Sequence, residues 1–292
     1  MRRTFEWSRA AQAWSCSHPA WFMMLSFAAA AALYAVTENG TLGSAAVQSL
    51  MLSLLGVFLV AVSRPSSLGP TEPAAKTAVL AVGSYLCVIA LAEAVVGWQP
   101  QDLAQLRAPD LTARAFLAVV FCLATGIFEE ALFRIVAFRA LARGCLQNRA
   151  LKNYPLMSAA IVSSVLFALL HVQLDVSSLF GDGELGKATL KVLQAALFGF
   201  VMAGIQAKGG SLGVLAGTHA LYDLIVLGPG LLAGDAMLTA QSAAAEPLLA
   251  LAVSSVMLVL AAGVSGVFLR SSDRVLRDAL AAGDTHAVTC IL

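Results

Sequence analysis

Charged residues are scarce in this chain of 292 residues, where Asp, Glu, Lys and Arg together make up 12%. Soluble domains usually contain about 25% charged residues, so the deficit argues against an ordinary soluble protein. With 59% apolar residues and a mean hydropathy of +0.83, the composition is typical of a protein that lies in a lipid bilayer. The net charge of +1 and the lack of a basic run predict no nucleic-acid partner.

Cysteine pairs with metal-binding or redox spacing are also absent. The five cysteines are scattered along the chain without a C-x-x-C pair, at positions 16, 87, 122, 145 and 290. We therefore expect neither a disulfide framework nor a thiolate metal site. Cys290 is the third residue from the end, whereas a prenylation signal needs a cysteine in the fourth position. The chain is not expected to be prenylated itself.

Three familiar protease signatures are either absent or lie outside their structural context. None of the four histidines lies in an H-E-x-x-H helix, which excludes the usual zinc-protease motif. The stretch Gly209–Gly213 fits G-x-S-x-G, but it falls in a turn between two apolar stretches and not on a strand-to-helix elbow. The G-x-G-D motif of presenilin-type aspartyl proteases is absent as well.

Eight apolar stretches have about the length of a membrane-spanning helix, roughly 20 residues for a hydrocarbon core of about 30 Å. The segments between them are short and rich in Gly, Pro and charge, so none could link two domains. The sequence predicts one all-α polytopic membrane domain over residues 1–292, with about eight transmembrane helices. They are expected near 20–36, 44–62, 77–96, 113–138, 156–174, 188–206, 211–227 and 247–269.

The distribution of Lys and Arg predicts the orientation, because these residues accumulate on the cytoplasmic side of short loops. They gather before the first stretch, in the second, fourth and sixth loops, and after the last stretch: Arg2, Arg3, Arg9, Arg64, Lys76, Arg139, Arg143, Arg149, Lys152, Lys208, Arg270, Arg274 and Arg277. The intervening loops are poorer in positive charge, with Glu38, Asp102, Arg107, Asp110, Asp235 and a mixed set of Asp182, Glu184 and Lys187. This alternation indicates that both termini are cytoplasmic.

Several ionisable residues lie where lipid is expected. A charge at the centre of a membrane helix costs about 2.5 to 3.5 kcal/mol on insertion scales, so each needs a physical reason. Any one of them alone could be an ion pair, a packing histidine or an interface residue. Their grouping on three predicted helices favours a functional site, formed by Glu129, Glu130, Arg134, His171, His219 and Asp223.

Helical spacing predicts different roles for the two adjacent glutamates. Residues four apart in an α-helix share a face and residues five apart do not. Glu130 can therefore pair with Arg134 as a structural clamp, which leaves the carboxylate of Glu129 for chemistry. A carboxylate that water does not fully solvate can take and return a proton near neutral pH, as a general base acting on water must.

The two histidines have neighbours one helical turn away. Phe167 precedes His171 by four residues and is predicted to form a wall of the pocket. Asp223 follows His219 by the same spacing. The preceding Gly213 and Gly217 form a G-x-x-x-G face, which would let that helix approach a neighbour closely and bring His219 toward it.

The predicted helix bounds give inconsistent depths for the candidate residues. Glu129 would lie near the cytoplasmic end of its helix and His219 about 12 Å inside the bilayer, whereas His171 would lie much deeper. Either the fifth predicted helix begins well outside the bilayer, or the predicted bounds are wrong by a turn or more.

Taken in order, Glu129-Glu130-x-x-x-Arg134, Phe167-x-x-x-His171 and His219-x-x-x-Asp223 resemble the motifs of the CPBP family of membrane proteases. These proteins, also called the Abi family, are bacterial relatives of the type II CAAX prenyl endopeptidase. The resemblance covers residues 110–230, the expected catalytic core, and the Phe- and Gly-rich Phe198-Gly199-Phe200 is similar too. It implies a location in the bacterial inner membrane and a membrane-associated peptide or protein substrate.

The resemblance also implies roles for the site residues. Glu129 would activate a water molecule with help from His171, while His219 and residue 223 would stabilise the oxyanion or hold a metal. The family usually has Asn where this chain has Asp223, and an ionised carboxylate cannot donate a hydrogen bond. Asp223 could instead orient His219 or bind a cation. Whether Glu129, His171, His219 and Asp223 hold zinc or another divalent metal stays open.

Two other classes of function use similar residues. A proton- or ion-coupled transporter also places carboxylates and histidines at membrane depth, but it predicts related halves, and no such repeat is visible here. A non-catalytic immunity protein on the same fold is the other alternative.

Overall fold

The computed structural model describes residues 2–37, 41–71, 73–97, 110–171, 184–233 and 248–284, and within these ranges it is helical without strands. The loop residues Glu38, Asp102, Arg107, Asp182 and Asp235 and the terminal Cys290 lie outside these ranges. The helices are α1 (Arg2–Ser17), α2 (Pro19–Ala35), α3 (Leu42–Ser63), α4 (Pro73–Ala78), α5 (Ser84–Gly97), α7 (Leu111–Glu129), α8 (Phe138–Gln147), α9 (Pro155–Leu170), α10 (Glu184–Ala207), α11 (Leu212–Ala233) and α13 (Leu248–Ala281). Two π-helical segments, Val79–Gly83 and Glu130–Ala137, join α4 to α5 and α7 to α8, and Pro65–Leu68 forms a 3-10 turn.

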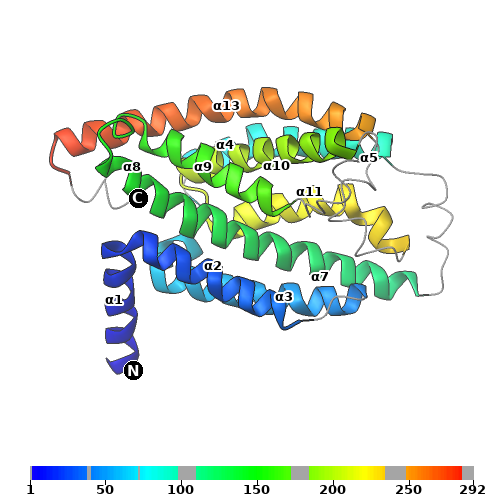
Figure 1. The fold of residues 1–292 in the computed structure, drawn as a ribbon, viewed down its shortest axis with the longest axis horizontal. Helices are drawn as coiled ribbons and strands as arrows, with labels where there is room; N and C mark the ends of the chain where they lie inside the picture. The colour runs from blue at the N-terminus through cyan, green and yellow to red at the C-terminus, as the bar shows by residue number, and fades with distance from the viewer. Residues whose placement is uncertain are drawn as a thin grey trace.

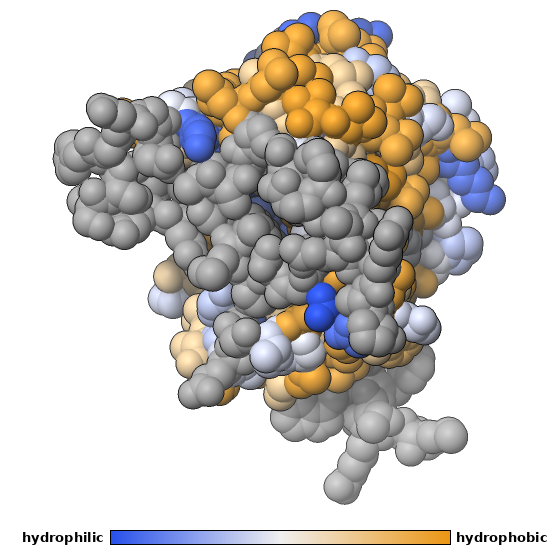
Figure 2. Space-filling view, turned by 90° about the vertical axis from the view of Figure 1, so that its right-hand side faces the viewer, coloured by the Kyte–Doolittle hydropathy of each residue, from blue (hydrophilic) through white to orange (hydrophobic). Residues whose placement is uncertain are grey.

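The helices from α2 onward run roughly along one direction as a bundle, whereas α1 stands across them at one end (Figure 1). Seen from the other end, apolar side chains cover much of the outer surface that is visible (Figure 2). Large hydrophobic side chains are exposed on the outside of α3, α7 and α13, among them Phe58, Phe116 and Val256. A helix bundle with an apolar exterior requires lipid as its solvent, so the predicted all-α membrane fold is confirmed.

All eight predicted apolar stretches are helical in the described residues, but they differ in their capacity to span. Six helices are long and apolar enough to cross a membrane. The helix α2 passes the same test only together with part of α1, from which it is bent by 107°. With 16 residues, α9 is about 24 Å long, less than a hydrocarbon core of about 30 Å. The exact number of spans and the orientation therefore stay predictions.

The fourth span is longer than predicted. Instead of ending near residue 138, the helix continues through the π-helical segment to Gln147, for a total of 37 residues. Arg139 lies within this helix and not in a loop. The extension is stable because Phe138 and Ala142 pack against Leu156 of α9 in a small core cluster. The charged residues after position 138 are typical of a loop, but packing against α9 keeps this segment helical.

This extension removes the inconsistency in depth. Glu129 lies 18 residues before Gln147, about 27 Å along the helix. His171 lies 16 residues after Pro155, at the far end of α9, about 24 Å from the same end of the bundle. The two side chains therefore reach the same level.

A buried carboxylate fixes the start of α9. The side chain of Asp273, on α13, accepts hydrogen bonds from the backbone N–H groups of Leu156 and Met157 at 2.8 and 3.1 Å. These are donors of the first helical turn, which have no partner within the helix. Asp273 thus determines where α9 begins and, one helix length later, where His171 lies.

The helices α7 and α11 approach closely at Gly126. A Cβ atom there would lie 2.9 Å from the carbonyl oxygen of Ala216 and 3.5 Å from Cβ of His219. In contrast, Gly213 and Gly217 are exposed, with no described atom within 4 Å of a Cβ placed on them. The predicted packing role of these two glycines is wrong, because the face of α11 that carries them points away from the bundle.

A polar contact at the other end of the pair holds α7 against α11. Arg114 donates to the carbonyl oxygen of Leu232 at 3.1 Å and to the carboxylate of Asp110 at 2.7 Å. The hydrogen bond from Arg114 lowers the pKa of Asp110 below its ordinary value. The contact with Leu232 helps to fix the axial register in which α7 meets α11.

Candidate active site

Glu129 lies between the two histidines. Its Oε2 atom is 3.5 Å from Nε2 of His171 and 3.4 Å from Nε2 of His219. The side chain is 16% exposed, and within the described residues its Oε2 atom accepts no hydrogen bond. Three helices therefore bring one carboxylate oxygen and two imidazole nitrogens together, with acceptor capacity left for a further small molecule such as water.

A backbone hydrogen bond orients His171. Its Nδ1 atom lies 2.8 Å from the carbonyl oxygen of Phe167, four residues earlier at the end of α9. A carbonyl only accepts, so Nδ1 carries the proton and donates it. In the neutral ring Nε2 is then unprotonated and directed toward Glu129. This is the arrangement in which a histidine can accept a proton from a water molecule.

His219 is held by the second glutamate. Its Nδ1 atom lies 2.7 Å from Oε1 of Glu130. The ring is buried, with 4% of the side chain exposed, and its Nε2 atom faces the carboxylates of Glu129 and Asp223 at 3.4 and 3.6 Å. Because ionised carboxylates only accept hydrogen bonds, both ring nitrogens of His219 are placed as donors.

Glu130 therefore has two partners. As spacing predicted, its Oε2 atom lies close to Arg134, 3.4 Å from Nε, and both side chains are fully buried. The assignment of Glu130 to this ion pair alone was incomplete, because the same carboxylate also binds His219. The segment Glu130–Ala137 is π-helical, and its wider turn changes the angles between side chains that α-helical spacing predicts.

Aromatic side chains pack around the Glu130–Arg134 ion pair. The Arg134 guanidinium lies 4.6 Å from the ring centre of Phe167. Gly199 makes this possible, since a Cβ atom there would lie 3.0 Å from an Arg134 nitrogen and 3.3 Å from the Phe167 ring. The adjacent Phe198 packs on His219 with ring centres 4.8 Å apart. The Phe-Gly-Phe motif thus supports both the clamp and a site histidine.

Phe167 does not form the pocket wall that was predicted for it. It is 2% exposed and packs under His171, with ring centres 4.0 Å apart, and against Phe133 at 5.1 Å. The four-residue spacing correctly placed Phe167 next to His171. The side chain lies behind the histidine because the neighbouring Phe133 occupies the cavity side.

A cavity of about 620 Å³ opens in front of the site. Glu129, His171 and Asp223 line it, whereas His219, Glu130 and Arg134 are not among its lining residues. Most of the remaining wall is apolar, with Phe27, Ala30, Leu52, Phe121, Phe128, Leu132, Phe133, Leu170, Val226 and Leu227 among its members. A molecule in the cavity would meet three of the six predicted polar residues directly, and the other three would act from behind them.

A polar network on the cavity wall was not assigned from the sequence. Glu93 of α5 is 3% exposed and accepts hydrogen bonds from Gln194 at 2.6 Å and from the Tyr222 hydroxyl at 2.7 Å. Tyr222 directly precedes Asp223, and all of these residues line the cavity. The available signal was that Glu93 is the one acidic residue inside the third predicted span.

No metal-binding group is assigned in the described part of the chain, since no three His, Cys, Asp or Glu side chains there are placed to hold one metal ion. Nδ1 of His219 is bound to Glu130, and its Nε2 atom lies 3.4 Å from Glu129 and 3.6 Å from Asp223.

The fold and this site define a polytopic membrane protein with a glutamate–histidine centre inside its helix bundle. Residues 111–225 match the family model of Rce1-like type II CAAX prenyl endopeptidases. All the site residues predicted from the motifs fall within this range. Over these residues the chain is similar to the CAAX protease family, which supports the resemblance that its motifs predicted. Neither the curated proteins nor the solved structures compared with the chain give a match.

Proposed function

We propose that the protein is an intramembrane endopeptidase that hydrolyses a peptide bond of a membrane-associated substrate. The observation that carries this proposal is the pairing of Glu129 with His171 on the wall of the cavity, 3.5 Å apart. A carboxylate and an unprotonated imidazole nitrogen at this distance can both bind one water molecule. The family match to a group of prenyl endopeptidases supports the same reaction class.

In the proposed reaction, Glu129 removes a proton from this water as its oxygen attacks the carbonyl carbon of the scissile bond. His171 accepts the second hydrogen bond of the water and fixes its position. The proton held by Glu129 then passes to the leaving nitrogen as the C–N bond breaks. The products are a carboxylic acid and an amine, and Glu129 returns to its starting form.

His219 is the proposed stabiliser of the negative charge on the carbonyl oxygen. Its Nε2 atom is the donor, and Oε1 of Glu130 holds the ring through Nδ1 at 2.7 Å. A rigidly held donor in a site with little water is worth more than the same donor in solution. Asp223 faces this nitrogen from the cavity, at 3.6 Å, and is proposed to hold it in position before substrate enters.

The orienting carboxylate of His219 is then Glu130 and not Asp223. In a catalytic triad the orienting carboxylate binds the ring nitrogen that does not face the substrate. Glu130 occupies that position, whereas Asp223 lies on the substrate side. Asp223 is therefore free to contact the substrate, which agrees with an Asn being usual at this position in the family.

The shape of the cavity supports an apolar segment beside the scissile bond. Its volume of about 620 Å³ is within the range of small-molecule and peptide side-chain pockets, and aromatic and aliphatic side chains form most of its wall. A lipid-modified or strongly apolar residue would bury its surface there without loss of hydrogen bonds.

The test uses purified protein reconstituted into vesicles, with two internally quenched peptides that end in the CAAX pattern. One peptide is S-farnesylated and the other is not. We expect cleavage by the wild type. Turnover should fall by at least about 100-fold in Glu129→Gln, since a general base commonly contributes 10²- to 10⁴-fold to the rate. Retained turnover in that variant would refute the mechanism.

Two controls make the result interpretable. Glu129→Gln should leave helix content and thermal unfolding close to wild type, because Glu129 is partly exposed and its Oε2 atom accepts no hydrogen bond. Comparing the two peptides tests peptide-bond cleavage and the requirement for a lipid group separately. Cleavage of the unmodified peptide alone would keep the endopeptidase and assign it a substrate without a lipid group.

A further inference from the structure

The cavity in front of the candidate active site has a polar wall that the proposed reaction does not use. On the side of α5, α10 and α11 it is lined by Glu93, Gln194 and Tyr222. The walls from α2, α3 and α7 are mainly apolar apart from Glu129. A molecule in the cavity would therefore meet polar groups on one side and apolar groups on the other.

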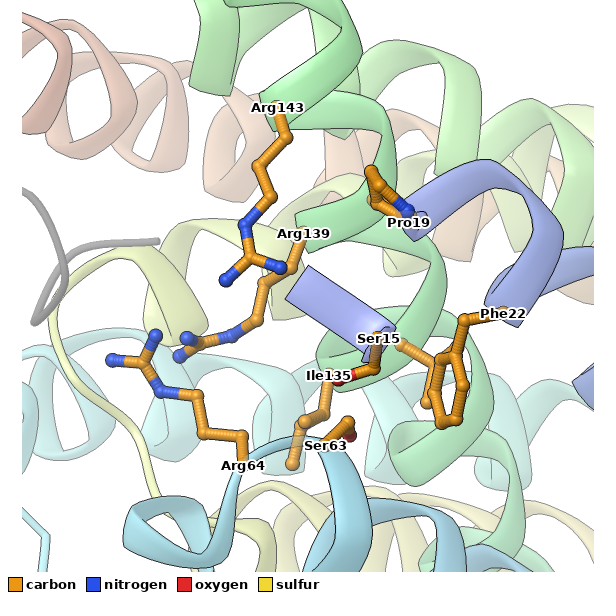
Figure 3. Close-up of a pocket in the computed structure, with 10 residues that line it drawn as sticks. Ser15, Pro19, Phe22, Ser63, Arg64, Ile135, Arg139 and Arg143 are labelled. Atoms are coloured by element: carbon orange, nitrogen blue, oxygen red, sulfur yellow. The ribbon is translucent and has the colours of Figure 1, made fainter. Parts of the chain in front are cut away.

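A smaller cleft at the end of the bundle where α1 meets α2 does not offer comparable space. Its volume is about 20 Å³, and Arg64, Arg139 and Arg143 lie on one side of it (Figure 3). One buried water molecule needs roughly 10 to 15 Å³ of such space, so this cleft admits little more than water. A peptide segment is accommodated by the cavity of about 620 Å³.

Glu93 is the centre of the polar wall. It is 3% exposed, and its two carboxylate oxygens accept hydrogen bonds from two different helices. Oε1 accepts from the side-chain amide of Gln194 at 2.6 Å, and Oε2 accepts from the Tyr222 hydroxyl at 2.7 Å. The amide nitrogen of Gln194 also donates to the hydroxyl of Ser254, on α13, at 2.8 Å. These contacts join α5, α10, α11 and α13 at the cavity.

The carboxylate of Glu93 fixes the orientation of the Gln194 amide. A glutamine side chain has two N–H donors on its nitrogen and one carbonyl oxygen that accepts. Because Glu93 accepts from the nitrogen, this end of the amide must face α5, and its two donors are used by Glu93 and Ser254. The group that Gln194 retains for a ligand in the cavity is its Oε1 atom, an acceptor.

A peptide in an apolar cavity needs acceptors of this kind. Every backbone N–H group except that of proline is a donor, and burying it without a partner is costly. In the proposed reaction, Glu129 and His171 act at the scissile bond, so the amides on either side of that bond need other partners. Gln194 offers an acceptor on the wall that also carries Tyr222, the residue directly before Asp223.

We propose that Gln194 is a substrate-binding residue that accepts a hydrogen bond from a backbone N–H group next to the scissile bond. Glu93 is the positioning residue that holds the Gln194 amide for this role. The proposal rests on the proposed endopeptidase function and adds the part of the substrate that is recognised, the peptide backbone. Side chains or a lipid group of the substrate are then left to the apolar walls.

The experiment uses the internally quenched CAAX peptides and the full-length protein in vesicles. The cleaved bond is identified by mass spectrometry of the products. A set of peptides then carries one N-methyl group at each of the other backbone amides in turn, which removes one N–H donor at a time. For the wild type we expect one position at which N-methylation raises KM about tenfold and changes kcat by less than about twofold, since one buried hydrogen bond contributes on that order.

Gln194→Met removes the acceptor and keeps a side chain of similar length. In this variant the KM of the unmodified peptide should rise about tenfold, and N-methylation at the sensitive position should have no further effect. The matched control is Ser254→Ala, which removes the other partner of the Gln194 amide nitrogen and is not among the described residues that line the cavity. Ser254→Ala should keep the KM and the N-methylation effect of the wild type.

The remaining outcomes also decide the proposal. A KM increase on N-methylation that persists in Gln194→Met would overturn it, and so would equal KM values of all peptides in the wild type. If Gln194→Met fails to fold, Glu93→Gln replaces it. An amide at residue 93 can donate as well as accept, so it no longer holds the Gln194 amide in one orientation. The N-methylation effect should then shrink, and an unchanged effect would overturn the proposal.

Failure of the peptidase function would be recognised separately. If the wild type cleaves none of the peptides, the endopeptidase proposal is refuted. The Kd values of the same peptides, labelled with a fluorophore and measured by fluorescence anisotropy, then test the subsite by itself. A single sensitive position in the wild type that is lost in Gln194→Met would retain the subsite, and equal Kd values would overturn it.

Discussion

Nδ1 of His219 lies 2.7 Å from Oε1 of Glu130, and this contact joins α11 to the π-helical segment of the fourth span. The same carboxylate lies 3.4 Å from Arg134, so one buried glutamate serves an ion pair and a site histidine together. In the proposed mechanism, stability and function are therefore coupled at this residue. The neighbouring Glu129 has no such structural role. Substitutions at the two positions are therefore expected to have different effects.

Glu130→Gln is expected to lower both stability and turnover. It removes the only carboxylate that contacts Arg134 closely among the described residues, and an unpaired buried charge commonly costs about 3 to 5 kcal/mol. Denaturation in detergent would measure the loss. In Arg134→Met combined with Glu130→Gln, stability should partly return while turnover stays low, because His219 still lacks its carboxylate. Full recovery of turnover in the double variant would contradict the role of Glu130 in holding His219.

Gly126→Ala is expected to reduce turnover by pushing α11 away from α7. The added Cβ atom would lie 2.9 Å from the carbonyl oxygen of Ala216, a distance that the backbone can relieve only by moving. His219 would then separate from both glutamates. The matched control is Gly217→Ala, whose Cβ meets no described atom and which should leave turnover unchanged. Similar activities of the two variants, measured at equal protein amounts, would show that the close approach is not needed.

Asp223→Asn is expected to retain turnover, whereas Asp223→Ala should lower it by roughly tenfold or more. The amide oxygen can still accept from Nε2 of His219, which lies 3.6 Å from the carboxylate, and the amide nitrogen adds a donor toward the cavity. Steady-state kinetics with the cleavable peptide would measure both variants. An Asn variant as impaired as the Ala variant would mean that the negative charge of Asp223 is essential.

Metal removal is expected to leave turnover unchanged. The proposed water activation uses Glu129 and His171, and the described His, Cys, Asp and Glu side chains include no group of three placed for one ion. Elemental analysis of the purified protein, before and after treatment with a chelator, should accompany the activity measurement. Activity that disappears with the chelator and returns with zinc would refute the metal-free mechanism.

Asp273→Ala is expected to destabilise the protein by about 1 to 3 kcal/mol, because two buried backbone donors at the start of α9 lose their acceptor. Asp278→Ala, on the exposed side of the same helix, is the control and should be nearly neutral. Thermal unfolding would measure both. Turnover of Asp273→Ala should fall as well, since a displaced α9 moves His171 away from Glu129.

The sequence by itself determined the fold class of the protein and named most residues of the candidate site. Apolar stretches of bilayer length specify membrane helices because hydrophobicity depends on each residue and not on its partners. The three motifs likewise identified the polar residues between Glu129 and Asp223, since charge within such a stretch is visible locally. The pairing of Glu130 with Arg134 followed from spacing within one helix.

Contacts between helices were decided only by the tertiary structure. Helix phase and axial position depend on packing, so the sequence could not tell that Gly126, and not Gly213 or Gly217, lies at the α7–α11 contact. The fourth helix extends to Gln147 because α9 covers it, although its charges resemble a loop. Both adjacent carboxylates, Glu129 and Glu130, contact the ring of His219, and spacing within a single helix cannot predict a contact with another helix. Local chemistry thus names the site residues, and packing decides which of them touch.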